Sequence, residues 1–224
     1  MKKIVITLPF LCVSFALPAQ RDWDTIPFIP DHYAERMALF AKQGVVTDKI
    51  MFLGNSITEG GNWAALLNDS TVVNRGIGGD ITFGILHRMD DIIKWKPSKL
   101  FLLIGINDLA KNIPDDVIIK NIFSIVGKIH KGSANTKVFV QSILPTNRAL
   151  EKFPAHYNRD DHVIVINRQL KKKARKFGFT FVDIYNRFLN KENHLDFKYT
   201  HDGLHLNGTG YQHWVHILKE LKCL

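Results

Sequence analysis

Short apolar runs alternate with longer segments of helical spacing along most of the chain. Strands are predicted for residues 50–53, 71–74, 100–104, 137–144 and 179–184, where mostly apolar residues follow one another without helical spacing. Such runs are typical of parallel strands that are covered on both faces. Helices are predicted for 31–42, for a segment that carries Trp63, for a segment ending near Trp95, for about 115–129, for about 160–176 and for the C-terminal segment. This alternation predicts an α/β fold with a parallel sheet.

A serine follows the first predicted strand, within the segment KIMFLGNSITEG at 49–60. Gly54 ends the strand, and Ser56 lies in the turn that leads to the next helix. Open α/β sheets bind ligands just outside the carboxyl ends of their strands, so the hydroxyl of Ser56 lies where chemistry is expected. Taken alone, however, Ser56 is better interpreted as a helix-capping serine.

The second and third predicted strands are also followed by small or polar residues. The loop RGIGGD at 75–80 does not match a dinucleotide-binding fingerprint, because Ile81 stands where the third glycine would. The loop is either a tight turn that needs positive φ or a helix N-terminus whose N–H meets a substrate oxygen, and the turn is favoured. Asn107 follows the third strand in GIND at 105–108, a sequence that is also common in ordinary turns.

The last informative segment is YTHDGLHLNGTGY at 199–211, in which Asp202 precedes His205 by three residues. The carboxylate can accept a hydrogen bond from Nδ1–H of the histidine, which leaves Nε2 as a base. Two alternatives stay open. His201 and His205 would form a metal site only with a third soft ligand, and none is evident, while Gly203 disfavours a regular helical face. In the second alternative, the segment 199–211 is only a polar turn.

The first 20 residues have the pattern of a secretory signal. Lys2 and Lys3 precede an apolar stretch at 4–17, and the chain turns polar at about residue 19. Lipidation at Cys12 is disfavoured, because this cysteine lies inside the apolar stretch. The predicted organisation is therefore a signal peptide at 1–20 and a single domain at 21–224, exported to a periplasm or beyond. Cys223 is the one cysteine left after cleavage, which excludes an intramolecular disulfide.

Charge and hydropathy narrow the possible partners. Residues 1–20 hold two lysines and no acidic residue, so cleavage leaves 28 basic and 21 acidic residues and a formal net charge of +7. The basic run KKKARK at 171–176 is interpreted as a solvated helix face rather than a nucleic-acid site, because no aromatic residues interleave with it. No second hydrophobic span follows the signal, so no stable membrane insertion is expected after cleavage. The oligomeric state is not predicted.

Taken together, the segments GNSIT, RGIGGD, GIND and DGLHL occur in an order and at a spacing that resemble the SGNH (GDSL-type) hydrolase family. The resemblance implies Ser56 as nucleophile, His205 as base and Asp202 as its orienting acid. It also implies an oxyanion hole made by the N–H of Ser56, the N–H of Gly79 and the side-chain amide of Asn107, with no metal or organic cofactor. Asn55 departs from the aspartate of the commonest family motif without touching any of these roles.

The same resemblance implies a flavodoxin-like, three-layer α/β/α sandwich with five parallel strands in the order 2-1-3-4-5. It also implies a serine esterase that forms an acyl-enzyme, similar to acetylhydrolases and bacterial carbohydrate esterases. The segments 145–160 and 186–200 are long, polar and aromatic, which favours a short acyl group, most simply acetyl, on a carbohydrate. A lipase, lysophospholipase or lipid acetylhydrolase is the enzymatic alternative. A flavodoxin-like phosphate-binding module is the alternative without catalysis, and it would have no use for Asp202 and His205.

Overall fold

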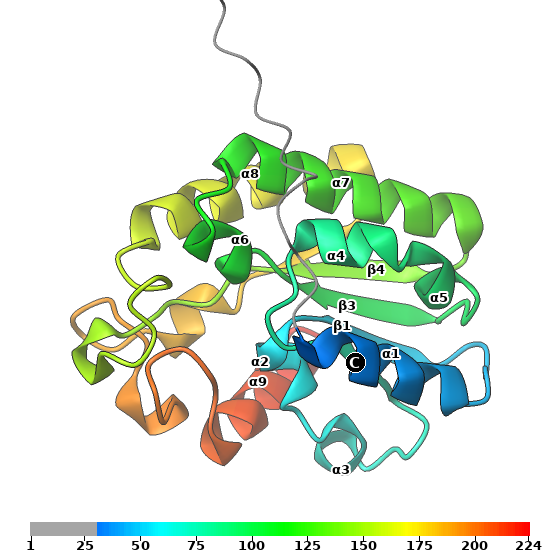
Figure 1. Ribbon diagram of the computed structural model, residues 1–224, viewed down its shortest axis with the longest axis horizontal. Helices are drawn as coiled ribbons and strands as arrows, with labels where there is room; N and C mark the ends of the chain where they lie inside the picture. The colour runs from blue at the N-terminus through cyan, green and yellow to red at the C-terminus, as the bar shows by residue number, and fades with distance from the viewer. Residues whose placement is uncertain (1–30) are drawn as a thin grey trace, which may run out of the picture.

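The computed structural model describes residues 31–224, and its centre is a parallel sheet of five strands (Figure 1). The predicted signal peptide at 1–20 lies outside the described residues. The strands are β1 (Ile50–Gly54), β2 (Val73–Gly76), β3 (Lys99–Leu103), β4 (Lys137–Gln141) and β5 (Thr180–Val182). Their order in the sheet is β2-β1-β3-β4-β5, so the predicted topology is confirmed. In the register of the sheet Gly54 pairs with both Gly76 and Leu103, and the three strands therefore end side by side.

Helices cover both faces of this sheet, which confirms the predicted three-layer sandwich (Figure 1). One face carries α4 (Thr82–His87), α5 (Met89–Ile93), α7 (Asp115–Gly132) and α8 (Asp160–Phe177). The other carries α1 (Asp31–Lys42), α3 (Trp63–Leu67) and α9 (Gly208–Glu220). Two short helices, α2 (Ser56–Glu59) and α6 (Ile106–Ala110), follow β1 and β3 directly, and three 3-10 turns lie later in the chain at Arg148–Leu150, Tyr185–Phe188 and Phe197–Tyr199.

A row of stacked aromatic rings holds the central strands together. Phe52, Phe101 and Phe139 occupy paired positions on β1, β3 and β4, with ring centroids 4.9 and 4.7 Å apart. Trp63 extends the row at 3.8 Å from Phe52 and meets the edge of Trp214 on α9. Each such pair contributes about 0.5–1.5 kcal/mol beyond the area that it buries. The row therefore packs β1, which leads to Ser56, against both β3 and the helices of one face.

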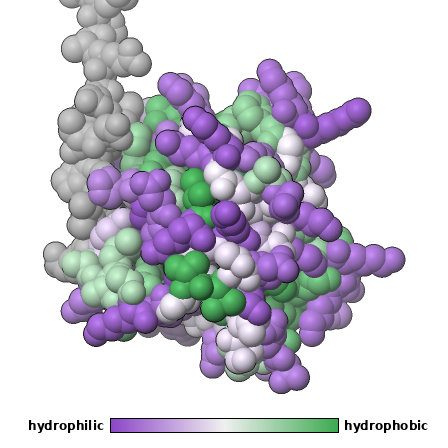
Figure 2. Space-filling model, turned by 90° about the vertical axis from the view of Figure 1, so that its right-hand side faces the viewer, coloured by the Kyte–Doolittle hydropathy of each residue, from purple (hydrophilic) through white to green (hydrophobic). Residues whose placement is uncertain are grey.

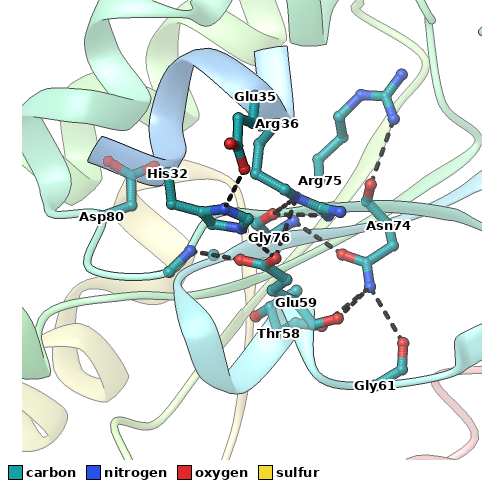
Figure 3. Close-up of polar contacts among 12 residues, drawn as sticks. His32, Glu35, Arg36, Thr58, Glu59, Gly61, Asn74, Arg75, Gly76 and Asp80 are labelled. Atoms are coloured by element: carbon teal, nitrogen blue, oxygen red, sulfur yellow. Dashed lines mark hydrogen bonds and ion pairs between the residues drawn. The ribbon is translucent and has the colours of Figure 1, made fainter. Parts of the chain in front are cut away.

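The second strand begins two residues later than predicted and continues through Gly76. The side chain of Asn74, near the middle of this strand, joins the strand to the segment around α2. Its amide nitrogen donates to the carbonyls of Thr58, Glu59 and Gly61 at 3.0–3.2 Å, and its oxygen accepts the N–H of Gly76 (Figure 3). Strands β4 and β5 are shorter than predicted for residues 137–144 and 179–184.

The helix predicted to end near Trp95 is two helices, α4 and α5, with a break at Arg88. The buried guanidinium of Arg88 donates to the carboxylate of Asp80 at 2.9 Å and to the carbonyls of Gly54 and Arg75 at 3.3 and 2.9 Å. Burial raises the pKa of Asp80 to about 6, and the charge of Arg88 acts in the opposite direction. The break thus places a cation under the ends of β1 and β2.

The surface is mostly hydrophilic where it can be followed in Figure 2, which shows the face at the amino ends of the strands. Apolar patches on this face are small and separated. Among residues 31–224, the helices are all too short or too polar to cross a membrane.

Candidate active site

The N-terminus of α2 presents the hydroxyl of Ser56 at the carboxyl end of β1. Asn55 is fully buried, and its side-chain oxygen accepts the N–H of Ile57 at 3.0 Å. Asn55 is therefore the helix cap, and the interpretation of Ser56 as a capping serine is wrong. The half-buried Ser56 follows as the first helical residue, and its hydroxyl is left for another partner.

That partner is His205, 149 residues later in the chain. Oγ of Ser56 lies 2.9 Å from Nε2 of His205, and Nδ1 of His205 lies 2.8 Å from Oδ2 of Asp202. Oδ1 of Asp202 accepts two backbone N–H groups, from Leu204 at 2.9 Å and from His205 at 2.7 Å. Burial raises the pKa of Asp202, but the hydrogen bonds from His205 and Leu204 outweigh it and lower the pKa. An ionised carboxylate only accepts, so the imidazole proton lies on Nδ1 and Nε2 faces Ser56 as an acceptor.

The turn that carries Asp202 and His205 is fixed by its neighbours. The hydroxyl of Thr200 donates to the carbonyl of His205 at 2.6 Å and accepts the N–H of Gly203 at 2.9 Å. Gly203 has a φ of +83°, and a β-carbon there would lie 2.1 Å from the carbonyl oxygen of Asn147. A glycine is required at this position, both for its backbone conformation and for the close approach of the loop at 145–160.

Gly79 lies in the turn between β2 and α4, with a φ of +76° and an exposed backbone. The preceding residue, Gly78, donates its N–H to the carboxylate of Glu59 at 2.5 Å. Since Glu59 belongs to α2, the glycine turn is attached to the same short helix that carries Ser56. A β-carbon added to Gly78 would lie 3.9 Å from Cβ of Ser56, so the two segments are adjacent.

The carboxylate of Glu59 also joins the first helix to the site (Figure 3). It contacts Nε2 of His32 at 2.7 Å and Nε of Arg36 at 3.3 Å. Arg36 donates further to the carbonyl of Gly76 at 3.0 Å, and the bond to Glu59 raises the pKa of His32. These contacts were not predicted from the sequence, because His32 and Glu59 are 27 residues apart and lie on different helices.

Asn107 lies on the short helix α6 and is only 7% exposed. An ordinary turn was the alternative interpretation of this segment. The amide nitrogen of Asn107 donates to the carbonyl of Asp80 at 2.9 Å, and its amide oxygen lies 2.9 Å from Nε2 of His156. The structure thus links Asn107 to the glycine turn on one side and to the loop at 145–160 on the other. Nothing in the sequence indicated the contact with His156.

The carboxylate of Asp108 is fully buried beside this site. It accepts the hydroxyl of Thr82 at 2.6 Å and the backbone N–H of Thr82 at 3.0 Å, which anchors the start of α4. Burial raises the pKa of Asp108 to about 7, and the hydrogen bonds from Thr82 act in the opposite direction.

We expect the pH dependence of stability to reflect this buried carboxylate. Between the ordinary pKa and about 7, the folded protein holds a proton that the unfolded chain has lost, so rising pH destabilises the fold. Asp108→Asn keeps an acceptor for Thr82 and removes the charge. The decrease in Tm between pH 5 and pH 8 should be smaller in this variant than in the wild type by about 3–8 °C. Asp161→Asn, at an exposed position, should leave the decrease unchanged; an unaltered decrease in Asp108→Asn would contradict the assignment.

The metal alternative concerns His201, whose ring lies beside the carboxylate of Asp202. Nε2 of His201 lies 3.3 Å from Oδ2 of Asp202, on an exposed side chain. Within residues 31–224, there is no cluster of three or more histidine, cysteine, aspartate or glutamate side chains that would hold a metal ion. The arrangement of hydroxyl, imidazole and carboxylate instead has the order that activates a serine for attack on a carbonyl carbon.

A serine, a histidine and an aspartate in contact with one another are an arrangement that many serine hydrolases share. Residues 52–213 match the family model described as the GDSL-like lipase/acylhydrolase family, and the chain belongs to this family. Among curated proteins, an arylesterase from Vibrio mimicus is 28% identical over 116 residues, which span 45% of this chain and 58% of the arylesterase.

Solved structures agree with this assignment. A GDSL-like lipase from Bacteroides thetaiotaomicron is 26% identical with a TM-score of 0.73, covering 86% of this chain and 98% of the lipase. The acetylxylan esterase Axe2 from Geobacillus stearothermophilus has a TM-score of 0.61 at 19% identity, covering 80% of this chain and 96% of the esterase. At that identity the second likeness concerns the fold alone.

Proposed function

We propose that this protein is an exported serine esterase that removes short acyl groups, most simply acetyl, from carbohydrates. The observation that carries the proposal is the continuous chain of contacts from Oγ of Ser56 through the imidazole of His205 to the carboxylate of Asp202. Membership of the acylhydrolase family supports ester hydrolysis as the reaction. The predicted signal at 1–20 supports export.

The reaction follows from the direction of these hydrogen bonds. Oγ of Ser56 attacks the ester carbonyl carbon while Nε2 of His205 takes its proton, and Asp202 stabilises the imidazolium that forms. The bond between the carbonyl carbon and the ester oxygen then breaks, and His205 gives the proton to the leaving alcohol. Water, deprotonated by the same nitrogen, attacks the acyl-serine, releases the carboxylic acid and returns the proton to Ser56.

The negative oxygen of the tetrahedral intermediate needs donors that are already in place. We assign this role to the N–H groups of Ser56 and Gly79 and to the amide nitrogen of Asn107. Gly79 is exposed in a left-handed conformation beside α2, and the N–H of its neighbour Gly78 is occupied by Glu59. The amide nitrogen of Asn107 uses one hydrogen for the carbonyl of Asp80, so its second hydrogen is available to a substrate.

Asn107→Ala should therefore lower kcat by roughly 10²–10³-fold, as expected for the loss of one oxyanion donor. KM should change far less, because this hydrogen bond strengthens as charge develops in the transition state. Steady-state kinetics on p-nitrophenyl acetate measures both quantities. A variant with a raised KM and an unchanged kcat would make Asn107 a ground-state substrate contact instead.

The surroundings of His205 favour a small acyl group. The ring of Phe153 meets the imidazole of His205 edge-on, with centroids 5.1 Å apart, and also meets His156 at 5.9 Å. Phe153 thus occupies space directly beside the base. The segment 145–160 that supplies it is otherwise rich in polar side chains, which suit a hydroxyl-bearing substrate better than a lipid chain.

Hydrolysis of p-nitrophenyl esters of increasing chain length, together with acetylated xylan and O-acetylated sialic acid, tests the substrate class. We expect kcat/KM to fall beyond butyrate and acetate to be released from at least one of the two glycans. Phe153→Ala should shift the preference toward longer chains, whereas Leu221→Ala, at an exposed position after the end of α9 and outside both segments, should not. A wild-type preference for octanoate without deacetylation of either glycan would assign the protein to lipid esters.

A further inference from the structure

A histidine outside the proposed catalytic residues contacts the oxyanion donor directly. His156, in the loop at 145–160, places Nε2 at 2.9 Å from the amide oxygen of Asn107, 49 residues away in the sequence. The other ring nitrogen, Nδ1, is buried and has no hydrogen-bond partner among residues 31–224. The ring therefore makes one polar contact in the described part of the protein, and that contact is with Asn107.

The protonation of His156 follows from its surroundings. Burial lowers its pKa, and the positive charges of Arg159 and Lys111 act in the same direction. The imidazole is therefore neutral near pH 7 and carries a single proton. Since the amide oxygen of Asn107 can only accept, that proton lies on Nε2 and is donated to Asn107.

Two contacts then determine how the amide of Asn107 is oriented. His156 holds the oxygen, and the carbonyl of Asp80 accepts one hydrogen of the nitrogen at 2.9 Å. Because the oxygen and one hydrogen of the amide are held in this way, the second hydrogen of the amide nitrogen points in a fixed direction. Electrostatic stabilisation of an oxyanion depends on donors that need no reorganisation when the charge develops, so a held amide is more effective than a rotating one.

We infer that His156 is a positioning residue for the oxyanion hole, acting through the amide oxygen of Asn107 and not by contact with the substrate. This inference rests on the proposed esterase function and extends it to a residue that no motif of the sequence indicates.

The loop that carries His156 is itself attached to the other half of the site. The hydroxyl of Tyr157 donates to the carbonyl of Asp202 at 2.8 Å and accepts the N–H of Phe153 at 3.1 Å. The loop thus supports both Asp202 and Asn107. A change in the loop would disturb both, so the test has to separate the hydrogen bond of His156 from the packing of the loop.

Two substitutions of similar length make this separation. His156→Met fills the space without donating a hydrogen bond, whereas the terminal amide of His156→Gln reaches the same acceptor with an N–H. We expect His156→Met to lower kcat on p-nitrophenyl acetate by about 10–50-fold with KM within about threefold, and His156→Gln to retain kcat within about fivefold of the wild type. His162→Ala, which removes an exposed histidine bonded to Asp115, is the control and should keep the wild-type kcat.

The decisive measurement is a double-mutant cycle with Asn107→Ala. If His156 acts through Asn107, adding His156→Met to Asn107→Ala should lower kcat by less than about twofold. The inference would be overturned if the decreases in kcat caused by His156→Met and Asn107→Ala multiplied in the double variant. It would also be overturned if His156→Gln lowered kcat as much as His156→Met while its Tm stayed unchanged. An active Ser56→Ala variant would instead overturn the proposed function, so the two failures are distinguishable.

Discussion

Replacing Ser56 by alanine should lower kcat for ester hydrolysis by roughly 10⁴–10⁶-fold, because the acyl-enzyme can no longer form. The fold should be unaffected, since Asn55 caps α2 and the hydroxyl of Ser56 contacts His205. Steady-state kinetics and thermal denaturation of the same preparation measure the two effects separately.

A fluorophosphonate probe provides an independent measurement on the same residue. It should label the wild type on Ser56 and leave the Ser56→Ala variant unlabelled. Ser124→Ala, which removes an exposed hydroxyl on α7, is the matched control and should keep both activity and labelling. Retention of most activity by Ser56→Ala would refute the proposed mechanism.

The strand pattern of the sequence was sufficient to predict at which edge of the sheet Ser56 and Asn107 would lie. Parallel strands of an α/β sheet end at one edge, so the residues that follow β1 and β3 had to lie at that edge. This rule places Ser56 and Asn107 at the edge, whereas the neighbouring positions of β1 and β3 in the sheet came from the resemblance. Asp202 and His205 lie far along the chain, and their place depended on the resemblance to the SGNH hydrolases. The roles of these four residues are predictions, which the experiments above address.

The boundaries of β2 were predicted less well, for a physical reason. Arg75 and Gly76 read as loop residues by propensity, yet both belong to the strand. A glycine is needed at position 76 because α2 lies directly against the strand. A β-carbon on Gly76 would be 2.2 Å from the backbone nitrogen of Glu59. Arg75 is fully buried with its guanidinium between the rings of Phe40 and Trp95. Tertiary contacts of this kind leave no local pattern.

The supporting residues of the site were missed for the same reason. His156 reaches Asn107 from an irregular loop, and Glu59 reaches His32 from another helix. Neither pair has a spacing that periodicity would reveal. Such contacts between loops and helix ends become visible only when the sheet has placed the segments beside each other.

A large effect is also expected for Asp202→Asn, which should lower kcat by about 10⁴-fold with little change in KM. The reason is that the two carboxylate oxygens of Asp202 have different hydrogen-bond partners. Oδ1 of Asp202 accepts the N–H groups of Leu204 and His205, and an asparagine would keep its oxygen there. Its NH₂ group would then face Nδ1 of His205, which must become an acceptor. The imidazole proton moves to Nε2, and Nε2 can no longer take the proton of Ser56.

The same arrangement predicts that the fold survives this substitution, because the backbone contacts of the turn are retained. Tm should stay within about 4 °C of the wild type, corresponding to about 1 kcal/mol. His201→Ala is the matched control, since it removes the exposed imidazole that also lies near Oδ2 of Asp202, at 3.3 Å, and it should keep most of the activity. If Asp202→Asn lowered kcat by less than about tenfold, the tautomer of His205 would have to be held by a group other than this carboxylate.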